Sequence, residues 1–213
     1  MADNYLENRY NEVFGSKKTI KKVGQTLDSM LLKNRSTRGY DPDILITEDV
    51  LKKIINVNTK VASARNQQVL RFKMVTKNTG ADIVLENIKL GGALPELHLP
   101  FAGTEPNAFI IICSTVKENK FIDMDLGISM QSMLLKAVEI GLNGIIIAAF
   151  NKDEISKAFN LKYEPLAVLA IGKSKEVIKL VNINPEDNHN YYRDENNIQY
   201  VPKIAVDNLI IND

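Results

Sequence analysis

The sequence predicts a soluble globular fold that mixes helices with strands, and three observations support this. Hydrophobic residues make up 45% and charged residues 25% of the chain, which is ordinary for a globular protein. Apolar residues recur at helical spacing in segments such as 19–33 and 47–57, and short apolar or alternating runs typical of strands occupy 70–76, 108–114 and 164–172. The 213 residues suffice for one large domain or two small ones with a substantial core.

Composition and charge exclude several classes of function. The net charge of +1 gives no general attraction to nucleic acid or to a membrane surface, and no basic face with interleaved aromatic residues is visible. The longest apolar runs are too short to span a bilayer, and the polar N-terminus lacks the apolar core of a signal peptide, so we expect a cytoplasmic protein. Cys113 lies in an apolar run, which favours a buried thiol over a nucleophile. Two histidines without a nearby cluster of ligands predict no metal site.

The N-terminal half predicts three helices and one strand. Helices are expected at 4–15, 19–33 and 47–57, the last with Thr47 as N-cap. The strand at 70–76 is expected to expose Arg71, Lys73 and Val75 on one wet face. Segment 81–90 reads as extended, and the long irregular connection 91–107 is expected to be a lid or binding loop.

The C-terminal half alternates apolar segments with polar connections. Segment 108–114 predicts a strand buried on both faces, and 125–140 predicts a central helix covered by other elements or by a partner subunit, with Gln131 buried inside it. A strand at 145–150, a helix capped by Asn151 and a strand at 164–172 follow. The polar stretch 184–197 is expected on the surface, with extended chain at 199–203 and 209–211.

A cluster of cations and hydroxyls at Arg35, Ser36 and Arg38 follows the second helix. Arginine binds phosphate bidentately and serine adds a neutral donor, so the cluster is suited to an anion. Cations also favour a helix C-terminus, so a capping role competes with anion binding.

A second polar cluster, Ser63, Arg65, Asn66 and Gln68, lies in the loop between the third helix and the first strand. Amide side chains supply both donors and acceptors, and arginine supplies a fork of donors, which would match the alternating edge of a planar heterocycle. The alternative is that these side chains tie down the backbone of their own loop.

Four stretches in this order resemble the nitroreductase family of flavin mononucleotide (FMN) enzymes. They are Arg35–Arg38, the loop 63–68, the long helix that ends in GLNGIIIAAF at 141–150, and the late YVPK at 200–203. The resemblance implies one domain over residues 1–213 with an α+β fold, in which a mostly antiparallel central sheet is flanked by helices in an intertwined homodimer. It implies two FMN molecules at the dimer interface, each touched by both subunits. Electrons would pass from NADH or NADPH, by a ping-pong mechanism, to nitroaromatics, quinones or similar small acceptors.

The resemblance also assigns cofactor-binding roles. Arg35, Ser36 and Lys203 match the positions that hold the flavin phosphate, and Arg38 matches a cation near the pyrimidine end of the ring. Asn66 matches the amide that pairs with the imide edge of the ring. Further contacts are implied for Ser63, Arg65 and Gln68 beside Asn66, and for the strand end Ile147, Ala148 and Ala149, whose backbone approaches flavin N5.

No catalytic side chain is expected, because hydride transfer through a flavin needs no protein acid or base at the reacting carbon. Asn34 and Ile204–Ala205 replace basic residues common in the family, which predicts weaker flavin affinity. Two alternatives stay open: a flavin-binding sensor or carrier without reductase turnover, and a flavin-dependent enzyme of related fold that acts on halogenated aromatics or on the flavin itself.

Overall fold

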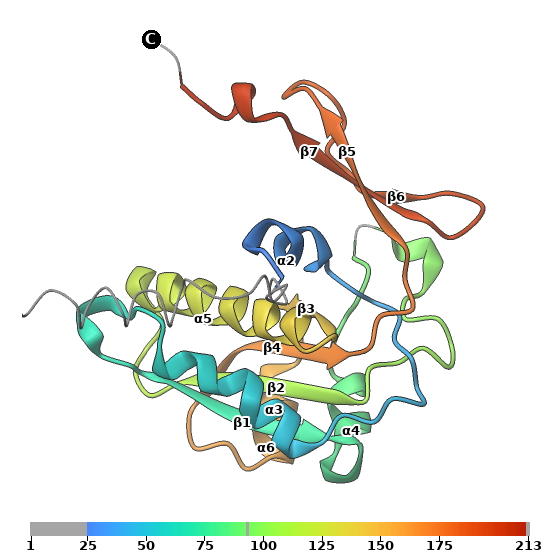
Figure 1. Ribbon diagram of the computed structural model, residues 1–213. Coiled ribbons are helices and arrows are strands. Elements are labelled where there is room, and N and C mark those ends of the chain that lie inside the picture. Colours follow the sequence, from blue (N-terminus) through green and yellow to red (C-terminus); the bar gives the residue numbers. More distant parts are fainter. Residues whose placement is uncertain (1–24, 93, 212–213) are drawn as a thin grey trace, which may run out of the picture.

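A four-stranded sheet lies at the centre of the computed structural model, which describes residues 25–92 and 94–211 (Figure 1). Its strands are β1 (Leu70–Thr76), β2 (Ala108–Ser114), β3 (Asn143–Ile147) and β4 (Glu164–Gly172), in the order β1-β2-β4-β3. Each neighbouring pair is antiparallel. The predicted central antiparallel sheet is therefore confirmed. The helix expected at 4–15 and the first part of that at 19–33 lie outside the described residues.

Helices cover both faces of this sheet. Helices α3 (Glu48–Ile55) and α5 (Lys120–Glu139) share one apolar cluster with one face, and α4 (Ala81–Glu86) and α6 (Lys152–Ala158) share a second cluster with the other. Every residue of β2 is buried, as the sequence predicts. Helix α2 (Leu27–Lys33) packs on α5. The α+β architecture expected from the sequence is thus confirmed.

Local signals explain where these helices begin. The side chains of Thr47 and Asn151 accept hydrogen bonds from backbone N–H groups in the first turns of α3 and α6, as predicted. Asn119 does the same for α5, which therefore begins five residues before the predicted helix. Gly141, at a φ of +84°, follows the end of α5 in the left-handed conformation that glycine adopts readily.

A second, three-stranded sheet follows β4 and projects from the rest of the chain (Figure 1). Strands β5 (Ile178–Ile183) and β7 (Gln199–Ile204) pair in parallel, and the short β6 (Tyr192–Arg193) pairs with β7 in antiparallel fashion. We call residues 173–204 the C-terminal sheet. Short 3-10 helices complete the chain at Asn56–Thr59, Ala64–Asn66, Lys77–Thr79, Pro95–Leu97 and Val206–Asn208.

Three expectations about the elements are wrong. Segment 81–90 is not extended, because Ala81 and Val84 lie one helical turn apart and pack together on the sheet as part of α4. The strand predicted at 145–150 begins and ends earlier, as β3, with Ile146 exposed. Leu209–Ile211 is not a strand and is exposed.

Two predicted burial states also differ from those in the structure. Gln131 is exposed and accepts a hydrogen bond from Asn34 at 3.3 Å, rather than lying inside a covered helix. Val75 is buried, because α4 and its neighbours cover that end of β1, whereas Arg71 and Lys73 are exposed as expected.

Within the described part of the chain, no helix is long and apolar enough to cross a membrane.

Candidate functional site

The segment Asn34–Arg38 runs beside the start of β3. Ser36 forms a parallel bridge with Gly144, and the Thr37 backbone N–H donates to the Gly144 carbonyl at 3.2 Å. A Cβ at position 144 would lie 2.4 Å from the Ala170 carbonyl oxygen, so the packing of this part of β3 against β4 requires glycine. The edge of the central sheet therefore fixes the backbone that carries the arginine–serine cluster.

Arg35 caps the helix before it, and one of its donors has no partner within the described residues. Its Nη2 donates to the Leu31 carbonyl at 2.7 Å, so it caps the end of α2. Its Nε is buried and has no hydrogen-bond partner among the described residues, and burial lowers the pKa of this guanidinium. The neighbouring Ser36 is exposed. A free guanidinium N–H next to an exposed hydroxyl suits an anion such as a phosphate.

Arg38 is enclosed by protein, with 7% of its surface exposed. Its Nη1 donates to the Ser36 carbonyl at 3.0 Å, and its guanidinium lies 4.6 Å from the centre of the Tyr191 ring. Its backbone N–H donates to Glu176 Oε2 at 2.7 Å. The C-terminal sheet therefore covers the arginine that the resemblance places near the pyrimidine end of the flavin.

The loop 63–68 adopts an unusual backbone conformation. Arg65, Asn66 and Gln68 have φ values of +52°, +54° and +49°, in the left-handed region that non-glycine residues rarely occupy. Gln68 Nε2 donates to Asn66 Oδ1 at 3.1 Å, and Ser63 Oγ accepts from the Gln68 backbone at 2.9 Å. The loop does tie down its own backbone, as the alternative reading expected. Strain of this kind also concentrates at binding sites.

The two clusters lie at different places along α5. Asp125, near the start of α5, accepts a hydrogen bond from the Ala64 backbone at 2.7 Å, whereas Val138, near its end, lines a cavity with Arg35 and Thr37. Because a helix rises by 1.5 Å per residue, these two points are separated by about 20 Å. One chain therefore does not bring Asn66 and Arg35 into one cavity.

Each cluster borders its own hollow. A cavity of about 470 Å³ lies between α3, α5 and the start of β1, and its lining includes Ser63, Gln68 and the buried Asp125. A second cavity of about 430 Å³ lies between α2, the end of α5 and the C-terminal sheet, and its lining includes Arg35, Lys173 and Glu176.

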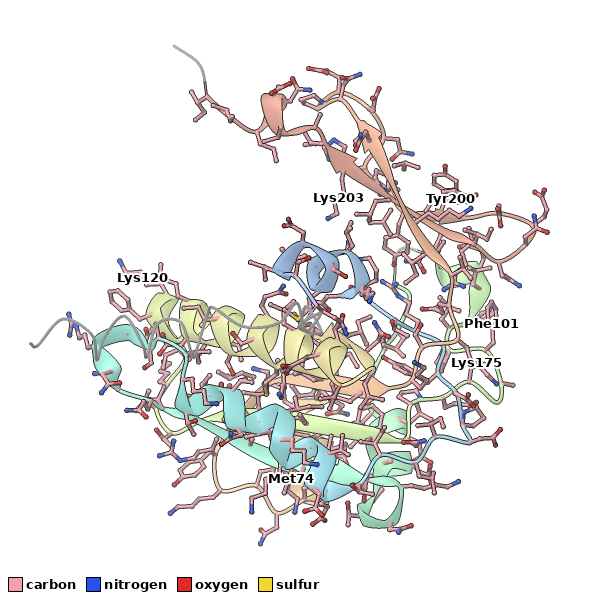
Figure 2. The ribbon with its side chains drawn as sticks, in the orientation of Figure 1. Met74, Phe101, Lys120, Lys175, Tyr200 and Lys203 are labelled. Carbon is pink, nitrogen blue, oxygen red and sulfur yellow. The ribbon has the colours of Figure 1, made fainter. Side chains whose placement is uncertain are left out.

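The remaining predicted site residues lie on β3, just after it, and on β7. Ile147 is buried at the end of β3, and Ala148 and Ala149 follow it on the surface. Lys203 is exposed on β7, in the projecting sheet, well away from Lys120 at the start of α5 (Figure 2). Residues 25–92 and 94–211 contain no group of three or more His, Cys, Asp or Glu side chains placed to hold a metal ion.

Sequence reasoning missed a buried polar cluster behind Arg38. Glu176 and Arg193 form an ion pair in which each side chain is 6% exposed, and Gln199 accepts a hydrogen bond from Arg193 at 2.9 Å. None of the three lies in a local motif. The signal that could have found them is spatial, since Glu176 reaches Arg38 across 138 positions of the sequence.

Comparisons with known proteins agree with this fold. The model of the nitroreductase family matches residues 31–173. A nitroreductase family protein from Clostridium novyi NT has a TM-score of 0.58 at 20% identity, and the match covers 70% of this chain and 86% of that one. No curated protein sequence matches the chain.

Two further similar structures hold ligands. A nitroreductase from Exiguobacterium sibiricum 255-15 in complex with FMN has a TM-score of 0.58 at 19% identity, with 71% of this chain and 89% of that one covered. An FMN-dependent nitroreductase from Mycobacterium smegmatis in complex with NADPH has a TM-score of 0.56 at 14% identity, with 70% and 87% covered. At these identities the likeness establishes the fold.

Proposed function

The chain belongs to the nitroreductase family, and from this premise we propose that it is an FMN-dependent oxidoreductase. In this proposal it takes electrons from NADH or NADPH and passes them, by a ping-pong mechanism, to nitroaromatic, quinone or similar small acceptors. The FMN and NADPH bound to the two similar structures support the choice of cofactor and donor. The observation that carries the proposal is the buried, unpartnered Nε of Arg35 beside the exposed Ser36, within the part of the chain that the structure describes.

The proposed phosphate site consists of Arg35, Ser36 and Lys203. A phosphate monoester carries nearly two negative charges near neutral pH, so it is held best by several cations and hydroxyls together. Arg35 offers a donor that its capping bond to Leu31 leaves unused, and Ser36 offers an accessible hydroxyl. The side chain of Asn34 is a neutral amide that donates to Gln131, so it adds no positive charge to the site. We therefore expect moderate rather than tight binding of the flavin.

The proposed ring site needs two copies of the chain. Because the loop 63–68 lies about 20 Å along α5 from the Arg35 cavity, Asn66 of one protomer would meet the Arg35–Arg38 segment of the other. Helix α5 offers a surface for such a dimer, since Phe121, Met124 and Ile128 are exposed on it. The homodimer is therefore part of the proposal.

The chain's own contribution is binding and orientation. FMN, when bound, would supply the ability to accept a hydride and to release electrons to an acceptor. Asn66 would hold the imide edge of the ring, assisted by Ser63, Arg65 and Gln68. The backbone of Ile147, Ala148 and Ala149 would approach N5, where the small, exposed alanines leave room. Arg38, placed by Tyr191 and Glu176, would add positive potential near the pyrimidine end.

Titration with FMN tests this function directly. We expect purified protein to quench FMN fluorescence, and we expect Arg35→Ala to weaken binding by about tenfold, the equivalent of one charge-assisted hydrogen bond. Lys157→Ala is the control, because Lys157 is an exposed cation that pairs with Glu154 on its own helix, α6. Protein that cannot be loaded with FMN at any concentration would refute the proposal.

Anaerobic stopped-flow mixing separates the enzyme from a flavin-binding sensor or carrier. We expect NADH or NADPH to bleach the FMN absorption of the loaded protein within seconds, and an added quinone to restore it. A yellow colour that persists after mixing with either nucleotide would contradict the enzyme and indicate a flavin-binding protein without reductase turnover.

A further inference from the structure

A buried polar cluster joins the C-terminal sheet to the segment Asn34–Arg38. It consists of Arg38 and Gln199, which are 7% and 2% exposed, and of Glu176 and Arg193, whose side chains are each 6% exposed. One carboxylate therefore pairs with the guanidinium of Arg193 and also accepts the backbone N–H of Arg38, away from water. Charges buried in this way are costly unless they are paired and hydrogen-bonded, so the arrangement depends on the single acid.

Both oxygens of Glu176 are engaged, and each contacts a different part of the chain. Oε1 accepts from Arg193 Nη2 of β6, and Oε2 accepts from the backbone N–H of Arg38 at 2.7 Å. Arg193 Nη2 also donates to Gln199 Oε1 of β7 at 2.9 Å. The carboxylate thus lies between two strands of the C-terminal sheet on one side and the arginine–serine segment on the other.

A short backbone ladder brings Glu176 to this position. Tyr40 and Ser174 form an antiparallel bridge, Asp41 N–H donates to the Lys173 carbonyl at 2.8 Å, and Lys175 N–H donates to the Gly39 carbonyl at 3.1 Å. A Cβ at Gly39 would lie 3.4 Å from Glu176 Cγ, so the side chain passes closely over this glycine. The ladder holds residues 173–175 alongside residues 39–41, and the Glu176 carboxylate then bonds to Arg38.

We propose that Glu176 is a positioning residue for the flavin site, because its carboxylate fixes the backbone that presents Arg35 and Ser36. The inference rests on the proposed function for the identity of the ligand. Arg38 is two residues from Ser36, and its Nη1 also holds the Ser36 carbonyl at 3.0 Å. Loss of the carboxylate removes the acceptor for the Arg38 N–H, frees Arg193, and loosens the turn on which the phosphate donors lie.

The proposal also assigns a role to the C-terminal sheet. The family model ends at residue 173, where this sheet begins. Through Glu176, the packing of β6 and β7 fixes the backbone of the segment Asn34–Arg38, which precedes them by more than 130 positions. The C-terminal sheet then contributes to flavin binding in two ways, directly through Lys203 and indirectly through Glu176.

The test compares Glu176→Gln with the parent protein, by FMN titration and by hydrogen exchange of the full-length chain. Glutamine keeps the size of the side chain but removes the charge that pairs with Arg193. We expect FMN binding to weaken about tenfold. We also expect faster exchange in peptides that cover 36–41 and 191–201, with unchanged exchange in β2. Glu176→Asp restores the charge and should recover part of the affinity, which a loss of packing alone would not predict.

Asp41→Asn is the matched control, because Asp41 forms a more exposed ion pair with Lys175 at 3.6 Å on the same ladder. It should leave FMN affinity and exchange unchanged. Arg193→Lys is a second variant in case Glu176→Gln does not fold. It keeps the positive charge but replaces the planar guanidinium, whose Nη2 reaches both Glu176 and Gln199, with the ammonium of a shorter side chain. It should weaken FMN binding and speed exchange in the same two segments.

The outcomes separate the two proposals. If folded Glu176→Gln binds FMN as tightly as the parent, the role of Glu176 is refuted and the proposed function stands. If only Arg193→Lys folds, parent-like affinity in that variant has the same meaning. A parent protein that binds no FMN overturns the proposed function. Exchange in segments 36–41 and 191–201 then decides whether Glu176 positions the arginine–serine segment, and unchanged exchange there refutes it.

Discussion

The central sheet and the C-terminal sheet differ in what holds them in place. Strands β2 and β4 of the central sheet are almost wholly buried, with an apolar cluster on each face. Strands β5 and β7 of the C-terminal sheet are mostly half-buried or exposed. Val177, just before β5, and Tyr192 on β6 are also exposed. The first sheet is stabilised by apolar burial, and the second is attached by the buried Glu176–Arg193 pair and its neighbours.

This difference shows that the fold and the proposed site are stabilised by different interactions. The central sheet, within the residues that match the family model, sets the architecture. The C-terminal sheet follows that match, projects from the body of the chain and carries Lys203 (Figure 2). Its exposed apolar surface suits contact with a second copy of the chain, as the proposed dimer requires.

The largest effect should come from truncation in the central sheet. Phe109 on β2 is fully buried, so Phe109→Ala should lower the free energy of unfolding by about 3–5 kcal/mol, measured by urea denaturation. Leu180→Ala on β5 truncates a side chain that is 37% exposed in the single chain, and should cost less than about 1 kcal/mol. If the cost of Leu180→Ala grows with protein concentration, a second copy covers the C-terminal sheet; equal costs for the two variants would contradict the distinction between the sheets.

A smaller and more local effect is expected in the C-terminal sheet. Gln199→Leu removes the acceptor for Arg193 while keeping the volume of the side chain, and should lower the free energy of local opening of β7 by about 1–3 kcal/mol. Native-state hydrogen exchange of β7 measures this, with no matching change in β2. Gln131→Leu is the control, because Gln131 makes a comparable side-chain hydrogen bond but is exposed. A loss of protection spread over both sheets would show that they open together.

The thiol of Cys113 allows the burial of β2 to be tested through pH. Burial raises the pKa of Cys113 from 9.0 to about 11. Between these values the unfolded chain releases the thiol proton while the folded chain keeps it, so the free energy of unfolding should fall as pH rises from 9 towards 11. Relative to pH 8, the parent should lose about 1 kcal/mol more than Cys113→Ala at pH 10, by urea denaturation. Parallel pH profiles for the two proteins would mean that the thiol is accessible to water.

Sequence predicted the central sheet well because its signals are local. Strands β1, β2 and β4 have the predicted bounds, since apolar or alternating runs end at polar or turn-forming residues. The caps at Thr47 and Asn151 likewise need only neighbouring residues. Strand β3 was misplaced because its start is set by Gly144, which fits against Ala170 of β4, and no local pattern reports that contact.

The site was harder to predict than the fold, because its geometry depends on residues far apart in the sequence. The positions of Arg35 and Ser36 after a helix could be predicted, but the enclosure of Arg38 by Tyr191 could not. Strand β5 was missed because its sequence is only weakly patterned and its partner β7 pairs with it in parallel from a later position. Glu176 carried no signal at all until Arg38 and Arg193 were found around it.

The smallest effect should come from an ion-pair network on the surface, which tests whether burial rather than the number of charges explains the Glu176 cluster. Lys152 Nζ lies 3.3 Å from Glu164 and 3.8 Å from Glu118, and all three side chains are between 41% and 53% exposed. Water screens such charges, so Lys152→Ala should change the free energy of unfolding by less than about 1 kcal/mol, with less effect still at high salt. Lys152 has two charged partners, and the Glu176 carboxylate likewise bonds two groups, Arg193 and the Arg38 N–H. The two clusters therefore differ mainly in their exposure to water. A loss as large as that from Gln199→Leu would therefore show that contact number, and not exclusion of water, makes the C-terminal attachment strong.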